Sequence, residues 1–263
     1  MNKEKGRSEM EKGDFSLLAE DYANYRPGYN RQVVKQITFA TELKPGDICA
    51  ADVGAGTGIF TNCLARLGIK KITAVEPNDE MRKVGEDVNG KYIKFLKGSA
   101  EKTNLSTKSL DLVSMASSFH WAKHEIALRE FNRVLNDNGV FTAIWNPRLT
   151  ERSEVEKRVQ SLLSEKYKIM ERVSSGRSGI TEKLREILLE SGYFKNIFYT
   201  DAIDVVQRSH EEYLGAWRSV NDIQAQLGSE KFNSFIKDVE NIIKDYKEVD
   251  VHYLTRAWVA KKS

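Results

Sequence analysis

The feature that most constrains this chain is a glycine-rich segment, DVGAGTG at 52–58, which lies directly between a buried-strand pattern and a helical pattern. A chain that leaves a strand and enters a helix over so few residues must turn sharply, and glycine allows the positive φ angles that such a turn needs. The helix that follows points its unbonded N–H groups at the turn, and ligands in open α/β sheets bind at the carboxyl ends of strands. The segment therefore predicts a ligand-binding loop in an α/β fold.

Short apolar runs alternate with helical patterns through the first half of the chain. Helices are expected at 16–25, 31–42, 58–67, 79–88 and 123–135, with turns at 44–47 and 136–139. Strands are expected at 48–53, 71–75, 92–96, 110–115 and 140–145. Strands that alternate with helices indicate βαβ units and a mostly parallel sheet.

The second half is richer in helical patterns. Helices are expected at 154–170, 181–191, 211–227 and 232–246, and a strand within 194–206. The residues of 249–259 alternate between apolar and polar, which is typical of a strand near a sheet edge. We expect a mobile tail at 1–14, a cofactor-binding core at 15–150, and at 151–263 the rest of the sheet with a helical cap over the acceptor site, all in one compact domain.

Composition indicates an ordinary globular protein. The 263 residues are 40% hydrophobic and 30% charged, and the formal net charge of +3 gives no reason to expect a nucleic-acid or membrane partner. No apolar run approaches the roughly 20 residues that cross a bilayer, and the first residues do not resemble a signal peptide. The two cysteines, Cys49 and Cys63, do not have the spacing of metal ligands, so we expect no metal. So few cysteines favour a reducing, cytoplasmic setting. We expect the chain to be a monomer or a homodimer.

Three positions bear on which cofactor the loop binds. Ile59 stands where the dinucleotide fingerprint has its third glycine. Glu76 ends the second strand, where a carboxylate can accept hydrogen bonds from the ribose of any adenosine cofactor. Asp52 would repel a pyrophosphate but suits the ammonium and sulfonium of S-adenosylmethionine. Alternatively, Asp52 only caps the turn that follows it.

Six further motifs accompany the glycine-rich segment, five of them after it and one before it. These are VEPNDEM at 75–81, GSAE at 98–101, SLDLV at 109–113, FHW at 119–121, FNRVL at 131–135 and YRPGY at 25–29. Together with the glycine-rich segment they resemble the class I S-adenosylmethionine-dependent methyltransferases, in the small-molecule branch that includes trans-aconitate methyltransferase-like proteins. The resemblance covers about 15–146. It implies a Rossmann-like, doubly wound, mostly parallel seven-stranded sheet with an antiparallel C-terminal strand and helical insertions that form a cap.

The resemblance also implies which residues bind S-adenosylmethionine and its product S-adenosylhomocysteine. The glycines would pass under the methionine part, with Asp52 near its amino group and Arg26 near its carboxylate, while Glu76 would hold the ribose. The full set that we expect to bind the cofactor is Tyr22, Arg26, Asp52, Gly54, Ala55, Gly56, Thr57, Gly58, Glu76, Pro77, Met81, Ser99, Ala100, Glu101, Ser117, Phe119, His120 and Trp121.

Methyl transfer from a sulfonium needs alignment of the acceptor more than it needs an activating group, and a base only where the nucleophile must lose a proton. His120 is the candidate for such a base, and the alternative is a wall residue that hydrogen-bonds the cofactor or a neighbour. Candidate acceptor-binding residues are Trp145, Asn146, Arg148, Tyr213 and Trp217.

Two motifs that this sequence lacks restrict the classes of molecule that could accept the methyl group. The fourth strand leads into MASSF at 115–119, without the Pro-Pro motif of enzymes that methylate amino groups of nucleic-acid bases, and no nucleophilic cysteine follows a strand. A small-molecule acceptor, methylated on oxygen or nitrogen, is therefore the expectation. An RNA or protein methyltransferase, a nicotinamide-dependent oxidoreductase and a non-catalytic cofactor-binding protein remain as alternatives.

Overall fold

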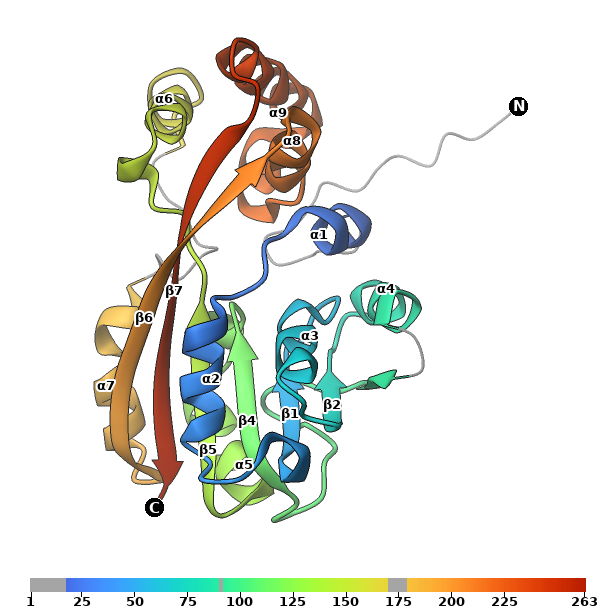
Figure 1. The fold of residues 1–263 in the computed structure, drawn as a ribbon, viewed down its shortest axis with the longest axis vertical. Coiled ribbons are helices and arrows are strands. Elements are labelled where there is room, and N and C mark those ends of the chain that lie inside the picture. The colour runs from blue at the N-terminus through green and yellow to red at the C-terminus, as the bar shows by residue number, and fades with distance from the viewer. Residues whose placement is uncertain (1–17, 90–91, 170–178) are drawn as a thin grey trace.

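A seven-stranded sheet in the order β3-β2-β1-β4-β5-β7-β6 forms the centre of the computed structural model, which describes residues 18–89, 92–169 and 179–263 (Figure 1). β1 to β5 pair in parallel, and β7 lies antiparallel between β5 and β6. The predicted α/β fold is therefore confirmed, whereas the tail expected at 1–14 lies outside the described residues. The strands are β1 (Cys49–Val53), β2 (Lys71–Val75), β3 (Lys94–Leu96), β4 (Leu110–Ala116), β5 (Leu135–Trp145), β6 (Phe194–Arg208) and β7 (Val249–Lys262).

Helices cover both faces of the sheet. One face packs against α2 and α3, and the other against α5 and α7, each through its own buried apolar cluster. The helices are α1 (Ala19–Tyr25), α2 (Arg31–Phe39), α3 (Ile59–Arg66), α4 (Asp79–Asn89), α5 (His124–Val134), α6 (Glu154–Ser161), α7 (Ile180–Glu190), α8 (His210–Arg218) and α9 (Asn221–Ile243).

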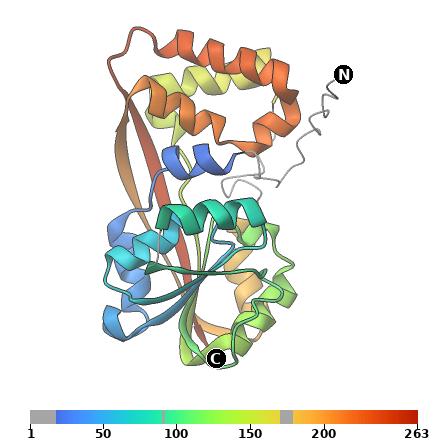
Figure 2. The same cartoon turned by 90° about the vertical axis from the view of Figure 1, so that its right-hand side faces the viewer.

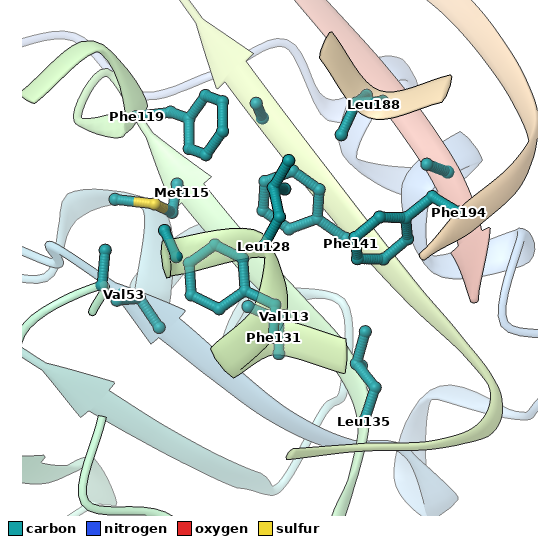
Figure 3. Close-up of a cluster of buried hydrophobic side chains, with 14 of the residues drawn as sticks. Val53, Val113, Met115, Phe119, Leu128, Phe131, Leu135, Phe141, Leu188 and Phe194 are labelled. Atoms are coloured by element: carbon teal, nitrogen blue, oxygen red, sulfur yellow. The ribbon is translucent and has the colours of Figure 1, made fainter. Parts of the chain in front are cut away.

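The central strands are apolar on both faces, as strands of a sheet covered on both sides must be. In β5, Phe141 faces the α5 and α7 side while Val140 faces the α2 and α3 side. Phe141 stacks on Phe131 of α5 with ring centroids 5.0 Å apart, and Phe194 of β6 lies on the other side of Phe141 (Figure 3). Burial of these aromatic rings ties the outer strand β6 to the parallel core.

A cap stands beyond one end of the sheet. β6 and β7 form one long antiparallel ladder, which runs past the parallel strands to α6, α8 and α9 (Figure 1). These cap helices have an apolar cluster of their own, in which Trp217 of α8 meets Phe235 of α9 edge-on at 5.5 Å. The position of the cap over the sheet therefore depends on the two strands that extend into it.

Three of the differences from the expected elements concern where the chain breaks or turns. The helix expected at 154–170 stops being α-helical at Ser161 and continues as a π-helical turn, Leu162–Lys166. The expected break near 228–231 is only a kink at Gly228, whose φ is 70°, and the chain breaks instead at 219–220. The expected turn at 136–139 is an irregularity within β5, where Asn138 has a φ of 68°. In each case the pattern of apolar residues does not mark the true break. It either continues across that break or is interrupted at another position.

The short helix α1 lies between the cap and the sheet (Figure 2). The Tyr25 hydroxyl donates to Oε1 of Glu211 at 3.1 Å, and Nη2 of Arg26 donates to the carbonyl oxygen of Ser219 at 3.0 Å. The contact with α8 is so close that a Cβ atom at Gly215 would overlap the Tyr25 ring. Gly215 is therefore the position that lets α1 dock on the cap.

We predict that Gly215→Ala lowers the free energy of unfolding by about 1–3 kcal/mol, because the added methyl group must displace the Tyr25 ring. Urea denaturation measures this value. Gly46→Ala is the matched control, since a Cβ there meets nothing within 4 Å and should change stability by no more than about 0.5 kcal/mol. Removal of the ring in Tyr25→Ala should abolish most of the cost of Gly215→Ala. Equal stability of the two glycine variants would contradict the close packing of α1 on α8.

Candidate functional site

A cavity of about 330 Å³ lies where β1, β2 and β4 end, and residues of α1, α6 and α8 complete its wall. The structure brings most of the predicted residues together there. Those on the wall are Tyr22, Arg26, Gly54, Ala55, Gly56, Glu76, Pro77, Met81, Ser99, Ala100, Glu101, Ser117, His120, Trp121, Asn146, Arg148 and Trp217. The predicted residues that are not on the wall are Asp52, Thr57, Gly58, Phe119, Trp145 and Tyr213.

The loop after β1 is held against the end of β2. The N–H groups of Gly54 and Ala55 both donate to the carbonyl oxygen of Val75, at 2.8 and 3.1 Å. Gly54 and Gly56 have φ angles of 67° and 57°, which glycine adopts at little cost. A Cβ at Gly54 would also stand 2.8 Å from the Ser118 side chain. The backbone of the loop can thus approach a ligand without side chains in between.

Glu76 ties this loop to its own strand. Its Oε2 accepts the Gly56 N–H at 2.7 Å, and its Oε1 accepts the Asn78 N–H at 2.9 Å. The side chain is only 6% exposed, and burial raises its pKa although these two N–H groups oppose the rise. Each carboxylate oxygen has a second lone pair, so a carboxylate on the cavity wall can still accept from a pair of neighbouring hydroxyl groups.

Asp52 is fully buried beneath the loop rather than on the cavity wall. Its Oδ2 accepts from the Thr61 hydroxyl at 2.7 Å and its Oδ1 from the Ser114 hydroxyl at 2.9 Å. Burial raises the pKa of Asp52 to about 6, against the effect of these hydrogen bonds. Asp52 thereby joins β1, β4 and α3, and its contact with a cofactor ammonium stays a prediction.

Three other predicted residues also face away from the cavity. Phe119 is fully buried in the core, with its ring centroid 5.5 Å from that of Phe141 (Figure 3). It begins a tight 3₁₀ turn, Phe119–Trp121, so its neighbours His120 and Trp121 can reach the wall while Phe119 cannot. Gly58 starts α3 with a φ of 85° and lies against Asn89, which donates to the carbonyl oxygen of Thr57 at 2.9 Å. Gly58 and Thr57 thus serve the packing of α3 on α4.

His120 is held in one protonation form. The indole N–H of Trp145 donates to Nδ1 of His120 at 3.4 Å. Burial lowers the pKa of His120 to about 4, helped by His124 and opposed by Asp222, so the ring is neutral at pH 7. With Nδ1 acting as acceptor, the ring proton must be on Nε2. That nitrogen is buried and has no hydrogen-bond partner among the described residues, which makes it a donor available to a ligand.

Arg26 offers a second donor at the α1 side of the cavity. Its Nη2 donates a hydrogen bond to the Ser219 carbonyl oxygen, and its guanidinium carbon lies 5.1 Å from the centre of the Tyr22 ring. Its Nε is buried and has no acceptor within the described part of the chain. A carboxylate that entered here would meet a positive charge and a directed N–H group.

The end of the cavity nearest the cap is lined by the charged side chains of Arg148 and Glu156 and by the amide of Asn146. Arg148 lies 4.2 Å from the centre of the Trp217 ring, and its Nη1 is 3.5 Å from Oε1 of Glu156. Tyr213, which is not itself on the wall, donates its hydroxyl to the same Oε1 at 2.7 Å. Asn146 links the Gly28 carbonyl oxygen to the Thr255 hydroxyl, at 2.7 and 2.9 Å.

Glu156 is the residue of this wall that the pattern of the sequence should have revealed. It lies on the apolar face of α6, in helical register with Val159 and Leu163, and is only 1% exposed. An acidic residue on an otherwise apolar helix face is unusual without a partner. Other wall residues that were not predicted, including Tyr29, Gln160 and Tyr253, come from segments whose contact with the loop depends on the tertiary fold.

Among the described residues, no group of acidic, histidine and cysteine side chains is arranged to hold a metal ion. Both Cys49 and Cys63 have thiols that are not in disulfides. Over the same part of the chain, each helix is too short or too polar to cross a membrane.

Comparison with known proteins points to one reaction class. The family profile described as a methyltransferase domain matches residues 51–143. An uncharacterised methyltransferase of Schizosaccharomyces pombe is 27% identical over 255 residues, which cover 94% of this chain and 96% of that protein. A methyltransferase-like protein of the same yeast is 35% identical, but over only 51% of this chain and 52% of its own length.

The fold has a counterpart among solved structures. A protein of Anaeromyxobacter dehalogenans, described as a candidate type II methyltransferase, superposes on this chain with a TM-score of 0.66. The superposition covers 90% of this chain and 98% of that protein. Its sequence identity is 18%, so this likeness concerns the fold alone. The same arrangement of sheet and cap therefore occurs in a protein of widely different sequence.

We predict that Glu76→Gln weakens binding of S-adenosylhomocysteine by about 1–3 kcal/mol, the cost of an unsatisfied buried polar group. Both carboxylate oxygens accept backbone N–H groups, so the amide NH₂ of glutamine must oppose one of them. Calorimetric titration measures the affinity, and Glu212→Gln is the control because Glu212 also accepts a backbone N–H, that of Ser209, but lies off the cavity wall. An unchanged affinity in Glu76→Gln would show that Glu76 does not organise the binding loop.

Proposed function

We propose that this chain, which belongs to the class I S-adenosylmethionine-dependent methyltransferases, transfers a methyl group to an oxygen or nitrogen atom of a small molecule. The observation that carries the proposal is the single cavity, which joins the glycine loop and Glu76 at one end to Arg148 and Glu156 at the other. A donor site and an acceptor site must adjoin for direct transfer, and this cavity provides room for both on one wall.

The residues at the sheet end of the cavity fit the cofactor. Gly54 and Gly56 place bare backbone on the cavity wall beside the methionine part, and the carboxylate of Glu76 suits the two ribose hydroxyls. The buried Nε of Arg26, without an acceptor of its own among the described residues, suits the cofactor carboxylate. Pro77, Met81 and Ala100 supply apolar surface for the adenine ring.

When bound, S-adenosylmethionine supplies a methyl group on a sulfonium, which needs no further activation. The chain then has to position the acceptor in line with that methyl group and to exclude water. Helix α1 and the cap helix α8 close over the cavity, and Tyr22, Arg26 and Trp217 form part of this cover. An acceptor inside would therefore be shielded from solvent while it is held.

His120 is better suited to hold the acceptor or the cofactor than to remove a proton. Its Nδ1 is occupied by the Trp145 N–H, so the imidazole presents an N–H rather than a lone pair at Nε2. Its pKa of about 4 also makes it a weak base at pH 7. We infer that His120 donates a hydrogen bond within the cavity and that transfer proceeds to an acceptor atom that is already nucleophilic.

The lining of the acceptor end favours a small molecule over a polymer. Residues of three separate segments, the loop after β5, α6 and α8, line this end together, so one small ligand can contact all three at once. The small net charge of the chain agrees with an acceptor that is not a nucleic acid.

The experiment that tests the proposal is calorimetric titration with three adenosine compounds. S-adenosylhomocysteine should bind more tightly than NAD, and 5′-methylthioadenosine, which lacks the amino-acid part, should bind in between. Arg26→Gln should weaken S-adenosylhomocysteine about tenfold, as expected for loss of a charge-assisted hydrogen bond, and leave 5′-methylthioadenosine unchanged.

Three results would each contradict a part of the proposal. Tight binding of NAD with no binding of S-adenosylhomocysteine would overturn the methyltransferase assignment of the cavity. An equal loss of both adenosine compounds in Arg26→Gln would show that Arg26 supports the fold of α1 rather than the carboxylate. Methylation of RNA or protein extracts, with none of small molecules, would overturn the assignment of the acceptor class.

A further inference from the structure

One oxygen of Glu156 is buried on the cavity wall without a donor. Its side chain is 1% exposed, and its Oε2 has no hydrogen-bond partner among the described residues. Buried carboxylate oxygens are nearly always paired, because an unpaired one loses its hydration without compensation. Glu156 is one of the residues that line the cap end of the cavity, so its unpaired oxygen lies in the wall of this space.

The other oxygen is fixed by its neighbours. Oε1 of Glu156 accepts from the Tyr213 hydroxyl at 2.7 Å and lies 3.5 Å from Nη1 of Arg148. Helix α6 is itself anchored at this point, because the Ser153 side chain accepts the backbone N–H of Glu156 at 3.4 Å. These contacts hold the carboxylate in one orientation, so Oε2 is a preorganised acceptor.

The charge at this end of the cavity favours one kind of ligand. The Arg148 guanidinium lies between the carboxylate and the Trp217 ring and balances the charge of Glu156. An anionic group placed at Oε2 would face a carboxylate at hydrogen-bonding distance and would be repelled. A carbonyl or ether oxygen would leave Oε2 as it is, whereas an O–H or N–H group would satisfy it.

We propose that the methyl acceptor carries a hydroxyl or amino group that donates a hydrogen bond to Oε2 of Glu156. The inference rests on the proposed function, because it takes the cap end of the cavity as the acceptor site. It adds a chemical requirement: acceptors must present a hydrogen-bond donor to the cap. Molecules of the same shape that present only carbonyl oxygens there are discriminated against.

The probes that test this requirement are cyclohexanol and cyclohexanone, which share a carbon skeleton and differ in the hydroxyl donor. Their affinities for the full chain loaded with S-adenosylhomocysteine are measured by ligand-observed nuclear magnetic resonance. Cyclohexanol should bind about ten- to hundredfold more tightly than cyclohexanone, the ratio expected for one hydrogen bond to a charged group.

Glu156→Gln should invert this preference. Arg148 can only donate, so the amide oxygen of the introduced side chain must take the place of Oε1, and the NH₂ group then takes the place of Oε2. The wall becomes a donor, and cyclohexanone should bind at least as tightly as cyclohexanol. Tyr213→Phe is the matched control, because it removes a hydrogen bond from Oε1 and leaves Oε2 an acceptor, so the preference for cyclohexanol should persist.

The outcomes separate this inference from the proposed function. Failure of S-adenosylhomocysteine to bind would overturn the proposed function itself. Binding of S-adenosylhomocysteine with equal affinity for the two probes, or with no binding of either, would overturn the role of Glu156 alone. If Glu156→Gln fails to fold, as judged by circular dichroism, the comparison of the two probes on the unaltered chain still decides.

Discussion

The connection between the ends of β1 and β2 is the constraint on which the rest of this site depends. Glu76 accepts N–H groups from Gly56 and from Asn78, and the Val75 carbonyl oxygen accepts two more from the loop. These bonds hold the backbone of the loop in positive-φ conformations and place a buried carboxylate beside it. The same few residues thus shape the loop and supply its polar group, so the cofactor end needs little rearrangement to bind.

The acceptor end is built on a different part of the molecule. β6 and β7 carry the cap away from the parallel strands, and Arg148, Glu156 and Trp217 meet at its base. Helix α1 lies between the cap and the sheet, and Tyr25 and Arg26 join it to the cap (Figure 2). One cavity is therefore formed from segments that lie more than a hundred residues apart in sequence.

The cofactor end could be predicted from sequence because it is local. The glycine loop follows β1 directly and Glu76 ends the next strand, so parallel pairing of β1 with β2 is enough to bring them together. Predictions were less accurate where one side-chain direction decided the outcome. Phe119 points into the core while the next residue, His120, is on the wall, because the 3₁₀ turn alternates their directions. Asp52 is the last residue but one of β1 and is buried beneath the loop.

The acceptor end was only partly predictable for the opposite reason. The sequence pattern predicts Arg148 just after the fifth strand and Trp217 on a helix of the cap, whereas it indicates for Glu156 only a place in a helix. Its role appears when Tyr213, from α8, is placed against α6. Such a contact depends on how the cap helices pack, which no local pattern specifies. The role that we infer for His120 also changes from a base to a hydrogen-bond donor, because the Trp145 N–H donates to its Nδ1.

Hydrogen exchange measured by mass spectrometry, with and without S-adenosylhomocysteine, tests most directly the claim that the glycine loop and Glu76 form the cofactor site. We predict slower amide exchange on binding in segments 54–60 and 76–81 and in α1, with the outer strand β6 unchanged. Protection absent from 54–60 and 76–81, or confined to the cap, would contradict this claim.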